Sequence, residues 1–266
     1  MIGVALAYIA VGVMAGLIAG MLGLGGGVVI VPALALVFPL LHIPPPVLMQ
    51  LAIGTSLAVI VPTSMSSTWA HYRRGAIEGQ LVRLLLPGLV PGAVLGGWLA
   101  DKLPSAILSR IFGVFVLGVA TQIFFNATAP GRRPLPGATG LLATGAVIGT
   151  ASTLLGIGGG SLTVPFLSYC RLDMRRAVAT SSACGLVLGA VGAAVFLWAG
   201  RHRADLPPGA FGYVYLPAFL GIAVASVATA SLGARLAHSL PVPTLKRAFA
   251  VFLALAGLRM LGVLSF

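Results

Sequence analysis

Uncharged apolar runs of about 20 residues recur along this chain, and they restrict its fold more than any other feature. An α-helix needs a run of that length to cross the roughly 30 Å hydrocarbon core of a bilayer. The 266 residues are 59% hydrophobic and only 8% charged, with a mean hydropathy of +1.08. Because a soluble domain carries about 25% charged residues, the sequence predicts an all-α integral membrane protein in a lipid bilayer.

The chain reads as two related halves. Three stretches of the first half recur in the same order in the second: GLGGGVVIVP (23–32) as GIGGGSLTVP (156–165), AIGTS (52–56) as AVATS (177–181), and GGWLADKLPSAILSRIFGVF (96–115) as GARLAHSLPVPTLKRAFAVF (233–252). Chance similarity between apolar segments does not explain glycines, prolines and arginines matched in order. We predict homologous transmembrane repeats at 1–128 and 137–266, joined by a Pro/Gly-rich linker at 129–136.

Each half contains four long apolar segments and one short segment directly after the glycines. In the first half the long segments are 3–22, 47–70, 81–100 and 105–125, and the short one is 28–41. In the second half the long segments are 138–155, 177–199, 212–236 and 243–264, and the short one is 161–170. A helix of about 14 residues reaches only about 21 Å, so we predict that each short segment is a broken or re-entrant helix.

The basic residues favour opposite orientations of the two repeats. If the short segments do not count as crossings, the repeats are parallel and the 16 Lys and Arg residues divide equally between the two sides. If they count, the repeats are inverted and one side holds only five: Lys102, Arg110, Arg201, Arg203 and Arg259. Short cytoplasmic loops collect Lys and Arg, so we predict inverted repeats with both termini outside.

Contiguous glycines weaken a helix by about 1 kcal/mol each relative to alanine, so they need a compensating role. A glycine turn before a short helix offers backbone N–H groups and the positive end of a helix dipole, which together bind anions. We therefore predict substrate contacts at Gly25, Gly26, Gly27, Gly158, Gly159 and Gly160. Close helix packing is the alternative role, and we predict it for the glycines spaced by four: Gly12, Gly16, Gly20, Gly88, Gly92 and Gly96.

Two hydroxyl pairs recur between the halves, Thr55–Ser56 and Thr180–Ser181. Neutral donors of this kind can hold an oxyanion and still release it, so we include both pairs in the predicted substrate site. The alternative is ordinary, since Ser and Thr in helices often bond to their own backbone or to a neighbouring helix.

The ionisable residues add constraints on partners and direction. All four acids and all four histidines lie in or beside predicted loops, whereas a proton-coupled pump carries an ionisable group inside the membrane. One charge crossing 100 mV is worth about 2.3 kcal/mol, so an interior-negative membrane favours export of a monoanion.

The basic residues are scattered in pairs along the chain, and this scatter argues against binding of a nucleic acid. Cys170 and Cys184 have no metal-ligand spacing, so we expect no metal and no cofactor.

The motifs GLGGGVVIVPAL and GIGGGSLTVPFL, the following GTSLA and ATSSA, and GAVLGGWLADKLP resemble the TauE/SafE family of sulfite exporters. The resemblance covers nearly the whole chain. It implies a multi-pass permease of a bacterial inner membrane that exports a small sulfur-containing or organic anion, such as sulfite or a sulfonate. His71 stands where the family often has a histidine, but its counterpart in the second half is the apolar Phe196, so the repeat does not support a role for it.

Two other classes stay open at this point. An intramembrane enzyme needs a nucleophile with a base or metal ligands at depth, and the acids and histidines are too shallow for that, so we predict no enzyme. A non-transporting assembly or sensor subunit is the other alternative. The sequence fixes neither the anion nor the oligomeric state, and a homo-oligomer is compatible with it.

Overall fold

The computed structural model describes residues 2–22, 26–125, 134–236 and 242–263. The first half contains α1 (Ile2–Leu22), α2 (Gly27–Val37), the 3-10 helix η1 (Phe38–Leu41), α3 (Pro45–Tyr72), α4 (Gly79–Lys102) and α5 (Ser105–Phe124). The second half contains α6 (Ala138–Leu155), α7 (Gly160–Tyr169), α8 (Met174–Gly200), the two-residue strands β1 (Ala210–Phe211) and β2 (Val214–Tyr215), α9 (Leu216–Leu236) and α10 (Val242–Met260).

The predicted all-α membrane fold is confirmed. Among the described residues, five helices are long and apolar enough to cross a bilayer: α3, α4, α5, α6 and α8. The central helix is α3, because 72% of its most apolar window is buried inside the protein, against 33% for α5. Large apolar side chains such as Val147 and Val224 are exposed on the outer helices, as expected for a lipid-facing surface.

Prolines and glycines set the helix boundaries. Pro44 and Pro104 are the N-cap residues of α3 and α5, where the proline's missing N–H costs nothing. Gly156 ends α6 with a φ of 67°, a left-handed conformation that is strained for residues with a Cβ.

One predicted boundary is wrong. We expected a helix from residue 212, but α9 begins at Leu216, and a small antiparallel hairpin precedes it with Phe211 paired to Val214. Gly212 lies in the two-residue turn with a φ of 52°, as such hairpin turns require. Apolar content alone could not separate this aromatic hairpin from the helix that follows it.

Two helix pairs bring the halves together through the same close contacts. A Cβ on Gly12 of α1 would lie 2.7 Å from the carbonyl oxygen of Ile222 in α9. A Cβ on Gly145 of α6 would lie 2.5 Å from the carbonyl oxygen of Leu85 in α4. Each of these four residues lies eleven positions before the first glycine of its own matched motif. The α1–α9 contact is therefore the counterpart of the α6–α4 contact.

The next helical turn repeats this relation. A Cβ on Gly16 would lie 2.5 Å from the carbonyl oxygen of Ser226, and one on Gly149 would lie 2.4 Å from that of Leu89. Glycine at these positions lets two helix backbones approach without a side chain between them. The packing role predicted for the glycines spaced by four therefore holds at Gly12 and Gly16, and also at Gly88, Gly92 and Gly96, which face backbone atoms of α6.

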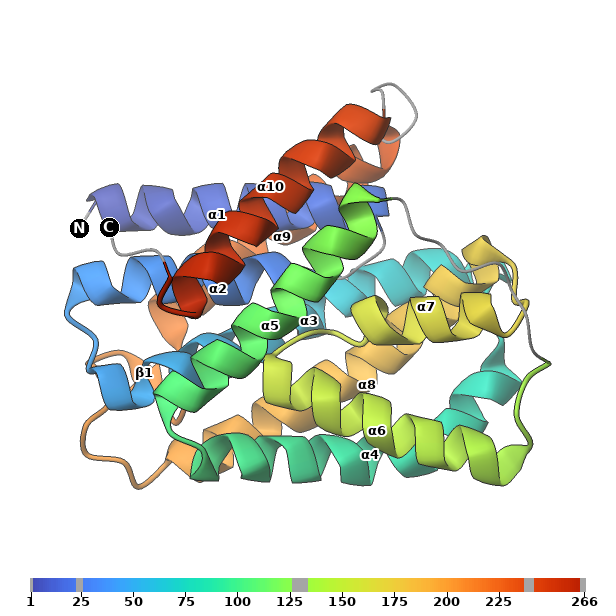
Figure 1. Cartoon of the computed structure of the whole chain (residues 1–266), viewed down its shortest axis with the longest axis horizontal. Helices are drawn as coiled ribbons and strands as arrows, with labels where there is room; N and C mark the ends of the chain where they lie inside the picture. Colours follow the sequence, from blue (N-terminus) through green and yellow to red (C-terminus); the bar gives the residue numbers. More distant parts are fainter. Residues whose placement is uncertain (1, 23–25, 126–133, 237–241, 264–266) are drawn as a thin grey trace.

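The central helices α3 and α8 also pair symmetrically. Ile60 lies against Gly189, and Ser64 lies against Gly185, so residue numbers rise along α3 as they fall along α8. Ile60 and Gly185 are matched positions of the two halves, as are Ser64 and Gly189. Equivalent helices thus run antiparallel, which supports the predicted inversion. We therefore propose that the halves are inverted repeats related by a pseudo-two-fold axis that crosses the α3–α8 contact (Figure 1).

The proposed inversion predicts where surface positions react. In a background lacking Cys170 and Cys184, we expect the variants Arg73→Cys and Arg201→Cys to be labelled from opposite membrane faces. Both positions are exposed, and they follow the C-terminal ends of the antiparallel helices α3 and α8. A membrane-impermeant maleimide applied to right-side-out and inside-out vesicles measures this, and labelling of both from one face would contradict the inversion.

The close helix contacts predict a stability effect. We expect Gly16→Val to lower stability by about 1–3 kcal/mol, the usual cost of overpacking, because its Cβ would lie 2.2 Å from Thr229 Oγ1. Gly118→Val is the matched control, since a Cβ there meets nothing within 4 Å. The measurement is the fraction of monodisperse protein that survives heating in detergent, and equal survival of the two variants would contradict the packing role.

Candidate functional site

The first short helix begins against the glycine turn that precedes the second, at the centre of the protein. A Cβ on Gly27, the first residue of α2, would lie 2.5 Å from the carbonyl oxygen of Gly156 and 2.9 Å from Cα of Ile157. From this contact α2 and α7 run in opposite directions, each covering about half of the bundle (Figure 1). The structure thus brings the two predicted glycine motifs together, although Gly25 lies outside the described residues.

The second glycine motif is a compact turn between α6 and α7. Gly156 and Gly159 have φ values of 67° and 68°, which glycine adopts without a steric cost. Inside the turn, the Gly159 N–H donates to the Ile157 carbonyl at 2.9 Å and the Gly160 N–H donates to the Gly158 carbonyl at 2.7 Å. These N–H groups therefore already have nearby acceptors, and an anion would bind by replacing these tight i to i+2 contacts.

The central helices enclose this turn. The carbonyl oxygen of Gly158 would lie 2.5 Å from a Cβ on Gly185 of α8, and Ile60 of α3 covers Gly158 from the other side. Ser56 fixes α3 to the motif, because its hydroxyl donates to the Gly156 carbonyl at 2.8 Å. Ser56 is fully buried, so this bond satisfies a carbonyl that the end of α6 leaves without a helical partner.

Helix ends, with no carboxylate among them, set the charge around the two glycine motifs. The N-terminal ends of α2 and α7 carry the partial positive charge of their helix dipoles. Each helix begins at a glycine motif, and the C-terminal end of α6 adds a partial negative charge beside the start of α2. The four carboxylates of the chain lie at helix ends or in loops: Glu78, Asp101, Asp173 and Asp205. Three of them pair with a neighbouring base, Glu78 with Arg176, Asp101 with Lys102 and Asp205 with Arg203. None of them offsets the positive helix ends directly.

Several buried hydroxyl groups of the second half, in α6, α7 and α8, lack a hydrogen-bond partner within the described part of the chain. Thr163, in the first turn of α7, is fully buried, and its Oγ1 has no hydrogen-bond partner among the described residues. The same holds for Ser181, and also for Ser152 and Thr153 near the end of α6. An unpaired buried hydroxyl is costly, so these groups suggest a polar ligand. Sequence comparison of the halves overlooked Thr163, because its counterpart in the first motif is the apolar Ile30.

The two predicted threonines do not meet. Ile60 of α3 contacts Gly189 of α8, and this contact serves as a reference point along both helices. Thr55 lies five residues before it on α3 and Thr180 nine residues before it on α8. Because the helices are antiparallel, the two threonines lie on opposite sides of the contact. At 1.5 Å per residue they are about 21 Å apart along the helices. A small anion cannot contact both at the same time. Ser56 and Ser181 are nearer the glycine turn, and the assignment of all four as substrate ligands stays a prediction.

His71 lies away from the centre, in the last turn of α3 beside Arg73 and Arg74. Its carbonyl oxygen accepts from the N–H groups of Arg74 and Ala76, which closes the turn after the helix. The structure therefore gives this residue a place in the loop that leaves α3, and its side chain is not part of the glycine site.

Membrane-spanning helices around paired half-helices define a multi-pass membrane transporter. The family model for the sulfite exporter TauE/SafE matches residues 8–260, and the chain belongs to this family. Proteins of this kind are transporters, not enzymes.

Several curated relatives carry similar names. A "Probable membrane transporter protein" of Haemophilus influenzae is 38% identical over 94% of this chain and 95% of its own length. "Probable membrane transporter protein YunE" of Bacillus subtilis is 32% identical over 65% of this chain and 71% of its own length. "Probable inner membrane transporter protein TsaS" of Comamonas testosteroni is 26% identical over 77% of this chain and 80% of its own length. No solved structure matches the chain.

The turn geometry predicts unequal tolerance within the glycine motifs. We expect Gly159→Ala to lower stability by about 1–2 kcal/mol, the cost of a left-handed backbone for a residue with a Cβ. Gly26→Ala is the control, because the Gly26 backbone is right-handed and its Cβ would meet Ile30 Cδ1 at 3.3 Å. Thermal unfolding followed by tryptophan fluorescence compares the two, and an unchanged midpoint for Gly159→Ala would contradict the strained turn.

Proposed function

We propose that this protein exports a small sulfur-containing or organic anion, sulfite or a sulfonate, through a site between its two repeats. The observation that carries the proposal is the contact of Gly27, the first residue of α2, with Gly156, where α6 ends and the turn into the second half-helix α7 begins at the centre of the fold. Secondary transporters place their sites at such broken helices near the middle of the membrane. Family membership supports transport, and the name of the family supports sulfite.

The polar groups of the site favour weak, reversible binding. Thr163 and Ser181 are neutral hydroxyls on the second half that are unpaired among the described residues, and the first half adds the Ser56 hydroxyl beside the apolar Ile30 and Ile60. A buried lysine or arginine would hold an anion more tightly and slow its release. Helix ends and hydroxyls attract the anion without that fixed charge, which suits a carrier that must let its substrate leave.

Export is also the direction that needs no coupled ion. An interior-negative potential of 100 mV moves a monoanion outward with about 2.3 kcal/mol per charge. The four acids lie at helix ends or in loops, away from the depth at which a proton relay would work. The membrane potential is sufficient to drive the proposed transport.

Flux measurements with purified protein in liposomes test the function. We expect protein-dependent sulfite efflux that increases when the lumen is made negative with a potassium gradient and valinomycin. Liposomes without protein and liposomes with Gly27→Val are the comparison. Absence of flux for sulfite, thiosulfate and small sulfonates would contradict the proposed substrate class.

The unpaired hydroxyl of Thr163 allows a sharper test. Thr163→Val keeps the shape of the side chain and removes a donor to a charged ligand, so we expect KM for the anion to rise by about 10- to 100-fold. We expect thermal stability to stay equal or increase, because the variant also removes an unpaired buried group. Thr121→Val on the exposed face of α5 is the matched control. An unchanged KM would place the anion elsewhere.

A further inference from the structure

We propose that Thr55 and Thr180 are paired gate residues, each of which holds closed the loop at one end of the transport path. The proposal rests on the transport function proposed above. The Tyr215 N–H donates to Thr55 Oγ1 at 2.9 Å, and the Glu78 N–H donates to Thr180 Oγ1 at 3.1 Å. Each bond joins the core of one half to the other half.

The two hydrogen bonds join equivalent positions of the two halves. Thr55 and Thr180 are the matched threonines of AIGTS and AVATS. Tyr215 directly precedes α9 and Glu78 directly precedes α4, and each lies 18 positions before the glycine that begins its matched stretch. Exchanging the two halves therefore exchanges one bond for the other.

Neither threonine uses its hydroxyl in the way a helical threonine usually does. Such hydroxyls normally bond to the carbonyl three or four residues earlier, as Thr63 and Thr121 do in this protein. Thr55 and Thr180 are both fully buried, and each accepts instead from the residue that begins a helix of the other half. Such a bond positions a loop, and it breaks when that loop moves.

The two bonds close opposite ends of the protein. The Thr55 bond lies in the half of α3 that is nearer its start, at the β1–β2 hairpin. Tyr213 of this hairpin is almost fully buried, and its hydroxyl donates to the Asp101 carboxylate at 3.1 Å. Burial and the Asp101 charge raise the pKa of Tyr213 to about 12, so it stays protonated and keeps donating. A Cβ on Gly54 would lie 2.2 Å from the Tyr213 carbonyl oxygen.

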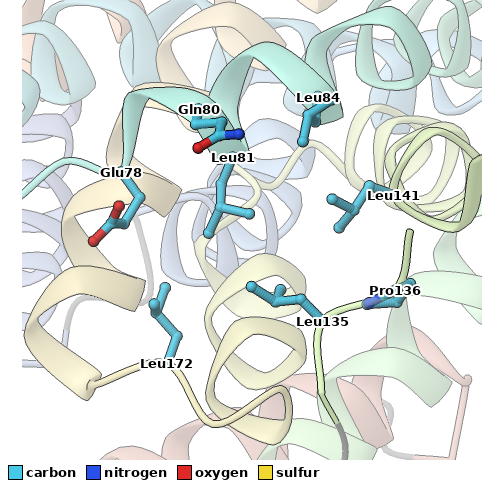
Figure 2. Close-up of a pocket in the computed structure, with 8 residues that line it drawn as sticks. All are labelled: Glu78, Gln80, Leu81, Leu84, Leu135, Pro136, Leu141 and Leu172. Carbon is cyan, nitrogen blue, oxygen red and sulfur yellow. The ribbon is translucent and has the colours of Figure 1, made fainter. Parts of the chain in front are cut away.

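The Thr180 bond lies at the arginine-rich end, which we define by Arg73, Arg74, Arg83, Arg175 and Arg176. Here the Glu78 carboxylate also accepts from the exposed Arg176 guanidinium. A pocket of about 360 Å³ lies beside this loop, and Figure 2 shows Leu81, Leu135 and Leu172 pointing into it with Glu78 at its edge.

Both bonds are formed in this structure, so both ends are closed at once. Alternating access in an inverted repeat requires that equivalent contacts break one at a time. In this scheme the structure corresponds to an occluded state, and release of Thr180 or of Thr55 would open the arginine-rich end or the opposite end, respectively.

Accessibility of buried cysteines tests the gates without any substrate. Cys184 lies one turn beyond Thr180 toward the centre and is fully buried, and its matched position in the first half is Val59, which is also fully buried. One background carries Cys170→Ser and keeps Cys184 as its reporter. The other carries Cys170→Ser, Cys184→Val and Val59→Cys. A membrane-impermeant methanethiosulfonate is applied from each face.

We expect Thr180→Val to raise the labelling rate of Cys184 from the arginine-rich face by about three- to tenfold, the effect of losing one neutral hydrogen bond. We expect Thr55→Val to do the same for the Val59→Cys reporter from the other face. Thr180→Ser and Thr55→Ser keep the accepting oxygen and should give parental rates.

The proposal is overturned if neither valine variant changes its own reporter, or if each variant raises both reporters equally, which would indicate general loosening. Monodispersity of each variant by size exclusion controls for folding. Since labelling needs no anion, these outcomes are independent of the flux assay, whose failure would instead contradict the proposed substrate.

Discussion

Everything else in this structure depends on the contact between the start of α2 and Gly156, where α6 ends and the turn into α7 begins. Helix ends at membrane depth leave backbone N–H groups without partners, and irregular backbone survives there only when protein encloses it. Gly27 and Gly156 let the two ends touch with no side chain between them. The remaining helices then have a defined task, because α3 and α8 enclose this contact while the pairs α1–α9 and α4–α6 and the pair α5–α10 lie around it.

Much of this arrangement could be predicted from the sequence, because hydropathy, proline and glycine act locally. The predicted segments match the helices closely, and the glycines spaced by four do face neighbouring backbones at Gly12, Gly16, Gly88, Gly92 and Gly96, whereas the surroundings of Gly20 lie outside the described part of the structure. Two features of the structure could not be predicted from the sequence. The hairpin before α9 is apolar and aromatic like a helix, and only the positive φ of Gly212 distinguishes it. The separation of Thr55 from Thr180 depends on the antiparallel contact of α3 and α8, which no local pattern encodes.

The two halves differ in their hydroxyl groups around the proposed anion site. Thr163 of the second half corresponds to Ile30 of the first, and Ser64 of the first half corresponds to Gly189 of the second. Both hydroxyls lie on the side of the pseudo-two-fold axis that holds the glycine turn before α7, because Thr163 and Ser64 both lie near Gly185 and that turn. A symmetric site would offer the anion two equivalent positions. In the proposed transporter the asymmetric site instead holds the anion against α7 and α8, while the apolar α2 side limits the water that accompanies it.

The same divergence makes the two gates unequal. At the hairpin end, closure includes the buried Tyr213 and the packing of the Tyr215 ring against Tyr8 and Phe38. At the arginine-rich end, Thr180 is supported by an ion pair whose arginine side chain is 61% exposed, and exposed pairs contribute only about 0–1 kcal/mol. The arginine-rich end should therefore open more readily. In the proposed topology the charge rule turns that end toward the cytoplasm, and the proposed exporter would load its anion from that side before it opens the more firmly closed gate.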